Sequence, residues 1–419
     1  MNLLKNNEID LMSPVGSSES LMAAIQAGAR SVYFGVGKLN MRSRSTVNFT
    51  IDDLHNISDI CRENRVNTYL TVNTVIYDEE IDEMHELLRA ASRCGISAII
   101  ASDVAVMQFA RQTGLEVHAS TQVNISNTEA VRFFSQWCDV VVLARELNLE
   151  QVSRINQNIV SQNICGPSGK PVKTEMFVHG ALCMAISGKC YLSLHEYAKS
   201  ANRGACFQSC RRSYRAIDNE SGYELEIDNE YIMSPKDLKT IHFLNKIIDA
   251  GVSVLKIEGR ARAPEYVKTV TACYREAIDS IAAGTYNEVL IGEWNQRLST
   301  VFNRGFWDGY YLGQKLGEWS MHYGSAATRT KTHIGRCTNY FAKSKVAEFI
   351  IETPDVLRMG NEVMVSGPTT GVVEFVVDEM RVDDGLVEKC EKGLPFSMKT
   401  PEPVRRNDKL YLYISEIKK

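Results

Sequence analysis

The feature that most restricts the fold of this chain is an alternation of short apolar runs with longer segments of helical periodicity, which continues from the N-terminus to about residue 258. Such an alternation is typical of repeated strand–helix units that form a parallel sheet. Eight runs resemble buried strands: Ile9–Met12, Ser31–Gly35, Thr68–Asn73, Ala98–Ser102, Glu116–Ser120, Asp139–Ala144, Glu175–His179 and Val252–Glu258. Eight strands predict an α/β fold of the TIM-like parallel β/α barrel type, with an open doubly wound sheet as the alternative.

The alternation of strand and helix patterns is interrupted once, and it does not continue to the C-terminus. About 50 residues rich in cysteine separate the seventh and eighth predicted strands. Beyond residue 326 the sequence changes to short alternating runs separated by Gly, Pro and Asp, which indicate a small antiparallel β-barrel or sandwich. We therefore expect a β/α barrel domain over residues 1–325, with a cysteine-rich insertion at about 180–230, and a small all-β domain, a β-barrel, over 326–419.

Composition places the chain among ordinary globular proteins. It has 419 residues, of which 44% are hydrophobic and 23% are charged, and its net charge of -4 excludes a uniformly basic coat for nucleic acid. A local basic patch is still compatible with RNA binding. No run approaches the roughly 20 apolar residues of a membrane span, and the first residues lack the apolar core of a secretion signal. The expectation is a cytoplasmic protein that does not interact with a membrane.

Four of the eleven cysteines are clustered in the insertion. Cys183, Cys190, Cys206 and Cys210 are separated by six, fifteen and three residues. In a reducing compartment such a cluster favours soft-metal ligands over disulfides. Four thiolates suit either zinc or an iron–sulfur cluster, but only the last pair has the spacing of a zinc knuckle.

The sequence around these cysteines resembles peptidase family U32, the collagenase-like proteases. The resemblance rests on Glu175–Cys183, Ser187–Cys190 and Asn202–Arg211, and it extends to Leu11–Gly16, Ser234–Leu238 and Lys256–Arg260. It is similar in particular to a branch of tRNA hydroxylation proteins, because Asn202-Arg203-Gly204 precedes Cys206 and Arg304–Gly309 forms a second shared element.

The resemblance implies an activity and a cofactor. Some members of the family are labelled proteases, whereas others hydroxylate tRNA wobble uridine, ribosomal RNA cytidine or a ubiquinone precursor without oxygen. The hydroxylases carry a 4Fe-4S cluster on four cysteines. The resemblance therefore implies conversion of tRNA wobble uridine to 5-hydroxyuridine, with prephenate, a small dicarboxylate, as the hydroxyl donor and tRNA or another RNA as the partner. No protein partner is indicated.

Polar residues at the predicted strand ends are candidates for catalysis, because the strand–helix loops of a barrel converge there. His179 ends the seventh strand and is a candidate proton donor or a support for the cysteine loop. Glu258 and Arg260 end the eighth strand, where they are candidates for a substrate-orienting ion pair, with Glu258 as a possible base; a structural salt bridge is the alternative.

Further charged and polar residues are candidates for substrate binding. Arg203 and Arg211 belong to a basic group around the cysteines whose guanidinium groups suit phosphate or carboxylate, or balance the charge of a cluster. Gln122 and Asn124 offer amides to a base edge or a carboxylate, or cap a loop. Asn40 and Arg42, after the second strand, are likewise candidates either for substrate binding or for loop capping.

Two other functions compete with hydroxylation. A peptidase would need a metal-bound water or an activated nucleophile, and the sequence contains neither H-E-x-x-H nor G-x-S-x-G. Cys183 with His179 is the one nucleophile–base pair that the sequence suggests, and metal ligation would consume its thiolate. The other competitor is an RNA-binding factor in which the metal is structural.

Overall fold

We analysed a computed structural model of the chain, which describes residues 9–44, 49–214, 216–222, 224–225, 233–321, 324–383 and 385–415. Eight parallel strands form a closed barrel, in which β11 pairs with both β1 and β7. These strands are β1 (Asp10–Pro14), β2 (Ser31–Gly35), β3 (Asn67–Val72), β4 (Ala98–Ala101), β5 (Glu116–Ala119), β6 (Val140–Val142), β7 (Lys173–Gly180) and β11 (Val254–Ile257). The predicted barrel is confirmed, and the open sheet is excluded.

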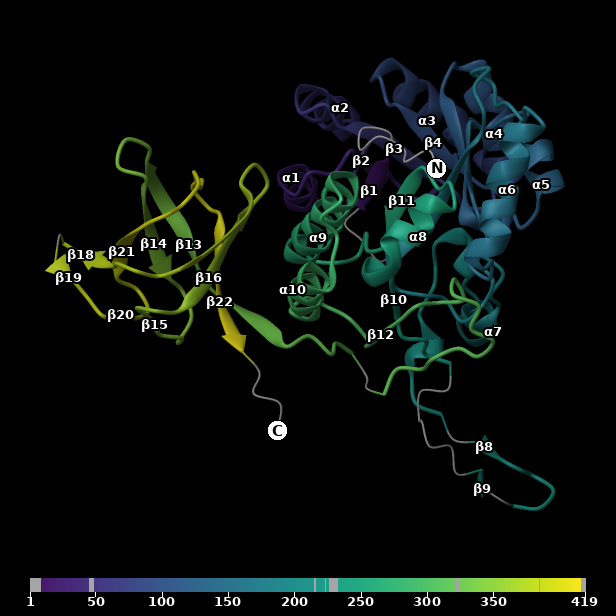
Figure 1. Cartoon of the computed structure of the whole chain (residues 1–419). Coiled ribbons are helices and arrows are strands. Elements are labelled where there is room, and N and C mark those ends of the chain that lie inside the picture. The colour runs from purple at the N-terminus through teal and green to yellow at the C-terminus, as the bar shows by residue number, and fades with distance from the viewer. Residues whose placement is uncertain are drawn as a thin grey trace.

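Helices cover the outside of the barrel (Figure 1). They are α1 (Ser18–Gln26), α2 (Asp53–Glu63), α3 (Ile81–Arg93), α4 (Val104–Gln112), α5 (Thr128–Phe134), α6 (Leu149–Ser161), α8 (Leu244–Asp249) and α9 (Pro264–Ala283), with α10 (Glu288–Ser299) packed on α9. Each apolar helix stripe packs against the outer faces of the strands, as an amphipathic periodicity predicts. None of the helices in the described parts of the chain is long and apolar enough to cross a membrane.

The segment between β7 and β11 contains all four clustered cysteines, as the sequence predicts. It holds the short helix α7 (Leu192–Tyr197) and the paired strands β8 (Ala216–Ile217) and β9 (Glu224–Leu225). It then returns to the barrel through β10 (Asp237–Lys239), which pairs antiparallel with the end of β7 and parallel with β12 (Phe306–Trp307). Residues 215, 223 and 226–232 of the predicted insertion lie outside the described residues.

The C-terminal part is an eight-stranded antiparallel sheet in the order β17-β16-β22-β13-β14-β21-β18-β19. Its strands are β13 (Arg329–Phe341), β14 (Val346–Ile351), β16 (Glu362–Gly367), β17 (Gly371–Val376), β18 (Arg381–Val382), β19 (Gly385–Leu386), β21 (Pro395–Lys399) and β22 (Lys409–Ser415), with a separate pair of β15 (Leu357–Arg358) and β20 (Lys389–Cys390). An all-β C-terminal part is confirmed.

This sheet packs on the side of the barrel that carries α1 and α9 (Figure 1). Gln26 donates a hydrogen bond to the carbonyl of Thr370 at 2.8 Å, and Lys268 donates to that of Val372 at 2.6 Å. Ala23 packs into an apolar cluster with Met364 and Val372. The contact lies between helices and the sheet edge, so it leaves the carboxyl ends of the barrel strands to the cysteine-bearing segment.

Candidate functional site

The centre of the barrel mouth is occupied by ionic residues from the ends of β2 and β11. Arg42 donates to Glu258 with 3.0 Å between Nη2 and Oε1, and its backbone NH donates to the side chain of the fully buried Asn40 at 3.1 Å. Arg260 is buried and donates to the hydroxyl of Thr71 at 2.7 Å. Glu258 is therefore paired with Arg42, whereas the sequence suggested a pair with Arg260.

Charge and burial set the protonation of these groups. Burial acts to raise the pKa of Glu258, but the guanidinium groups of Arg42 and Arg262 outweigh it and hold the pKa below the ordinary value. Burial lowers the pKa of Arg260 to about 10. Glu258 is thus a charged carboxylate at neutral pH and a weak base, suited to orienting a cation or a guanidinium group.

His179 ends β7 but does not open onto the mouth. It is 1% exposed, its Nδ1 lies 3.4 Å from the hydroxyl of Tyr274, and it is surrounded by aromatic rings that include Tyr266 and Phe306. Burial lowers its pKa to about 3, so the ring is neutral. In the described part of the chain no hydrogen bond joins it to Cys183, and its place favours support of the strand end over proton transfer.

Gly180 allows the ends of β7 and β11 to approach. Its φ is +104°, and a Cβ at this position would lie 2.5 Å from the carbonyl oxygen of Glu258. Any other residue would push the two strand ends apart. The chain therefore turns directly from the barrel into the segment that carries the cysteines.

The cysteine-bearing segment, Cys183–Cys210, packs over the loops that follow β2, β3 and β5. Gly204 has a φ of +79°, and a Cβ there would lie 2.5 Å from the carbonyl oxygen of Asn40. Arg211 ties the segment together because it donates to the carbonyl of Leu182 at 2.6 Å and to the hydroxyl of Ser234 at 2.9 Å. Arg211 is thus engaged by the protein itself.

All four cysteines of this segment are free thiols. Cys183 and Cys206 are exposed, and Cys190 and Cys210 are partly buried. Burial raises the pKa of Cys210; Arg211 opposes this shift, and the other three thiols reinforce it, so each of them lies within electrostatic reach of Cys210. They are not drawn together into a finished site: within the described residues no group of three or more His, Cys, Asp or Glu side chains is arranged to hold a metal ion.

A broad groove of about 1000 Å³ lies between the segment and the loops after β2 and β3. Arg203, in its wall, forms a two-pronged salt bridge with Glu80, at 2.7 and 2.5 Å, and stacks on Tyr77 at 3.8 Å. Four cations line the groove against two carboxylates: Lys38, Arg44, Lys199 and Arg203 against Glu80 and Glu83. Its surplus of positive charge suits an anionic chain.

The amides predicted after β5 have different surroundings. The carbonyl of Gln122 accepts from Asn73 at 3.1 Å, and its amide donates to the backbone carbonyl of the same residue, so it holds two loops together. Asn124 has a left-handed backbone with a φ of 58° and lines a second, smaller hollow. The loop-capping interpretation therefore applies to Gln122, whereas Asn124 faces a cavity.

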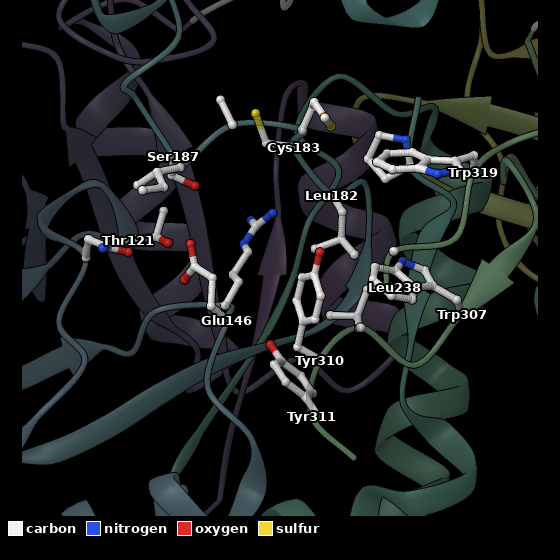
Figure 2. A pocket seen from close by; sticks show the side chains of 18 residues that line it. Thr121, Glu146, Leu182, Cys183, Ser187, Leu238, Trp307, Tyr310, Tyr311 and Trp319 are labelled. Atoms are coloured by element: carbon white, nitrogen blue, oxygen red, sulfur yellow. The ribbon is translucent and has the colours of Figure 1, made fainter. Parts of the chain in front are cut away.

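This aromatic hollow, of about 150 Å³, lies between the first turn of the cysteine-bearing segment and the chain after β12 (Figure 2). Trp307, Tyr310 and Trp319 form one side, and Cys183 and Ser187 lie across from them. Arg145 and Glu146 line it from the end of β6. The stretch from Phe302 to Tyr311 is visibly aromatic in the sequence, but its place at the mouth was not predicted, because the pairing of β12 with β10 that brings it there has no local signal.

The barrel lumen contains a buried ionic network that was not predicted from the sequence. Lys256 donates to Glu175 at 2.7 Å, and both side chains are buried. The second oxygen of Glu175 lies 3.6 Å from Nδ1 of His118, which is buried and whose ring lies tilted against that of Tyr69, with 4.5 Å between the ring centres. Charged residues inside otherwise apolar strand runs were the available signal.

Comparisons with known proteins agree on one family. The description "Peptidase family U32" matches residues 16–321. A protein named collagenase from Porphyromonas gingivalis is 61% identical over 97% of this chain and 98% of its own length. A tRNA hydroxylation protein of Bacillus subtilis is 32% identical over 88% of this chain and 87% of its own. A synthase of 5-hydroxycytidine in 23S rRNA from Escherichia coli is 33% identical over 66% of this chain and 40% of its own.

The matches cover the barrel and the cysteine-bearing segment together, and they carry two kinds of name, protease and RNA hydroxylase. The chain belongs to peptidase family U32.

Proposed function

We propose that the protein hydroxylates a base of RNA without molecular oxygen, with tRNA wobble uridine as the substrate and a 4Fe-4S cluster as the cofactor. The observation that carries the proposal is the set of four free thiols on one segment above the barrel mouth. Relatives named for tRNA and rRNA hydroxylation align across this part of the chain. Together these facts favour a soft-metal redox centre placed beside an RNA-sized groove.

The donor set fits an iron–sulfur cluster in kind, because the four cysteines of the segment offer the soft sulfur ligands that such clusters take. Such a cluster supplies one-electron chemistry or a Lewis-acidic iron when bound. The protein's part is to hold the segment: Ser209 and Arg212 both bond to Glu196 of α7, at 2.5 and 2.6 Å, which braces the turn that carries Cys206 and Cys210.

The mouth and the groove provide separate places for the two substrates. Arg42, with 36% of its side chain exposed, is a cation at the mouth suited to a small dicarboxylate such as prephenate. Arg260 is too buried to touch a ligand without a rearrangement, and it supports the end of β3 through Thr71. The groove lined by Lys38, Arg44 and Lys199 suits RNA phosphates.

A peptidase is the second candidate, because a relative with 61% identity is named collagenase. The candidate nucleophile and base do not support it: Cys183 is exposed and His179 is buried behind aromatic rings. An RNA-binding factor with a structural metal is the third candidate, and it differs from a hydroxylase in binding RNA equally well as apoprotein.

One experiment separates a hydroxylase from a peptidase, and the RNA affinity of the apoprotein distinguishes an RNA-binding factor. The full chain is purified without air, its iron and sulfide are measured, and tRNA nucleosides from a deletion strain are analysed by mass spectrometry. A hydroxylase gives a brown protein with about four irons per chain and a strain that lacks 5-hydroxyuridine derivatives until the gene is restored. A colourless protein that cleaves collagen or gelatin, with unchanged nucleosides, would overturn the proposal in favour of a peptidase.

A further inference from the structure

The aromatic hollow contains buried donors that the protein leaves without a partner. Trp307 is 5% exposed, and its indole Nε1 has no hydrogen-bond partner within the described residues. The Nε of Arg145, which lines the same hollow, is also buried and unpaired there. An unpaired buried donor is costly, so it indicates a ligand that presents acceptors.

The arginine is held rigidly in this position. Its Nη1 donates to the carbonyl of Ala181 at 3.3 Å, and its guanidinium group stacks on Phe177 at 3.9 Å from the ring centre. Arg145 cannot easily turn away to find water. The two donors therefore form a preorganised pair beside the first turn of the cysteine-bearing segment.

The walls of the hollow favour a flat ring. Trp307 and Tyr310 meet edge to face at 5.3 Å, and Trp319 extends the aromatic side (Figure 2). A cavity of about 150 Å³ has room for a single base, and aromatic side chains are the usual stacking partners of unpaired bases. The exposed Glu146 and the half-buried Asn124 add a carboxylate and an amide to the lining.

We propose that this hollow receives one uracil ring turned out of a single-stranded RNA loop. The inference rests on the proposed function and adds to it the place of the base. The two carbonyl oxygens of uracil match the two unpaired donors, and its N–H matches the acceptors Glu146 and Asn124. The base is thereby held next to Cys183, and Trp307 and Arg145 are the residues that select a carbonyl edge.

The test uses tryptophan fluorescence of the anaerobically purified full chain. Two of its four tryptophans, Trp307 and Trp319, line the hollow, so a stacked base quenches them. A single-stranded tetranucleotide with one internal uridine is compared with the same strand abasic at that position and with benzoate. We expect saturable quenching by the uridine strand only.

Trp307→Phe keeps the ring and removes the donor. It should weaken binding of the uridine strand by about 5- to 30-fold without lowering the melting temperature, since no partner is lost in the free protein. Trp137→Phe is the matched control, because Trp137 packs on Phe133 away from the hollow. Should Trp307→Phe fail to fold, Arg145→Lys, which keeps the charge and removes Nε, should show the same weakening.

Equal quenching by the abasic strand, or unchanged affinity in the folded variant, would overturn the inference. Saturation by benzoate with no response to the uridine strand would also overturn it and assign the hollow to a small carboxylate. Failure of the proposed function has a different outcome. If the protein lacks iron or forms no hydroxylated nucleoside but still binds the uridine strand, the base-binding site is supported and the hydroxylation is not.

Discussion

The barrel lumen and the cysteine-bearing segment use polar side chains in opposite ways. In the lumen, Lys256 and Glu175 are buried and paired at 2.7 Å, and Asp10 accepts from Ser31 and Tyr69 at 2.6 and 2.8 Å. In the segment, Cys183 and Cys206 are exposed, and Tyr191 keeps 76% of its surface in solvent. The lumen uses its polar groups to specify the fold, and the segment leaves its groups available for ligands.

The largest expected effect tests the lumen. Lys256→Met leaves the carboxylate of Glu175 buried without its cation, which should reduce the free energy of unfolding by about 3–5 kcal/mol in chemical denaturation. Adding Glu175→Leu to the variant removes the stranded charge and should restore most of this loss. A Lys256→Met variant as stable as the parent would contradict a role of the Lys256–Glu175 ion pair in folding stability.

The next effect tests the segment. Cys206→Ser should remove iron from the anaerobically purified protein and lower formation of the hydroxylated nucleoside by more than about 100-fold, because loss of a ligand exceeds the effect of outer-shell changes. The melting temperature of the apoprotein should stay the same, since this thiol is exposed. Cys165→Ser, outside the segment, is the control and should retain both iron and activity.

A third effect lies at the junction of the two regions. Glu258→Gln removes the carboxylate paired with Arg42 and should cost about 1.5–3 kcal/mol at neutral pH. The pKa of Glu258 is below its ordinary 4.5 in the folded protein, so this stabilisation is complete above pH 4.5 and is lost as the pH falls through the folded pKa. Unfolding curves of parent and variant should therefore converge in acid; a constant difference would contradict the pairing.

The smallest effect concerns the groove. Arg44→Ala with Lys199→Ala should weaken RNA binding by about 3- to 10-fold and reduce the slope of log affinity against log salt by about 1.4, close to 0.7 per phosphate contact. Lys343→Ala with Lys345→Ala, in the turn between β13 and β14 of the C-terminal sheet, is the matched control. A larger loss in the control would locate the RNA on that sheet and favour a binding factor.

The strands of the barrel were predictable because each is a local run of apolar residues. The strand Glu175–His179 was expected almost as observed within β7 (Lys173–Gly180), and the break before β11 was correctly located. Strands β10 and β12 were not predicted. They are two or three residues long and exist because they pair with β7 and with each other, which a single run of sequence does not reveal.

Candidate residues near the mouth were predictable in position but not in partner. Arg42, Glu258 and Arg260 do meet there, yet Glu258 pairs with Arg42, because burial of Arg260 beside Thr71 turns its guanidinium group away. Arg203 and Arg211 were expected to bind substrate, which stays a prediction; in the structure they are bonded to Glu80 and to backbone carbonyls. Sequence gives the chemical type of a side chain, and neighbours distant in the chain decide what it contacts.

The sequence by itself determined the repeated strand–helix pattern, the four thiols on one segment and the family, because each depends on residue type and short spacing. Only the tertiary structure decided that Trp307, Arg145 and Cys183 surround one hollow, and that the lumen is ionic. These arrangements join residues that are far apart in the chain, such as Lys256 and Glu175, which are 81 positions apart, and they follow from barrel closure and from the pairing of β12 with β10. Closure of the barrel brings residues that are distant in the sequence close together in space, where they form a site.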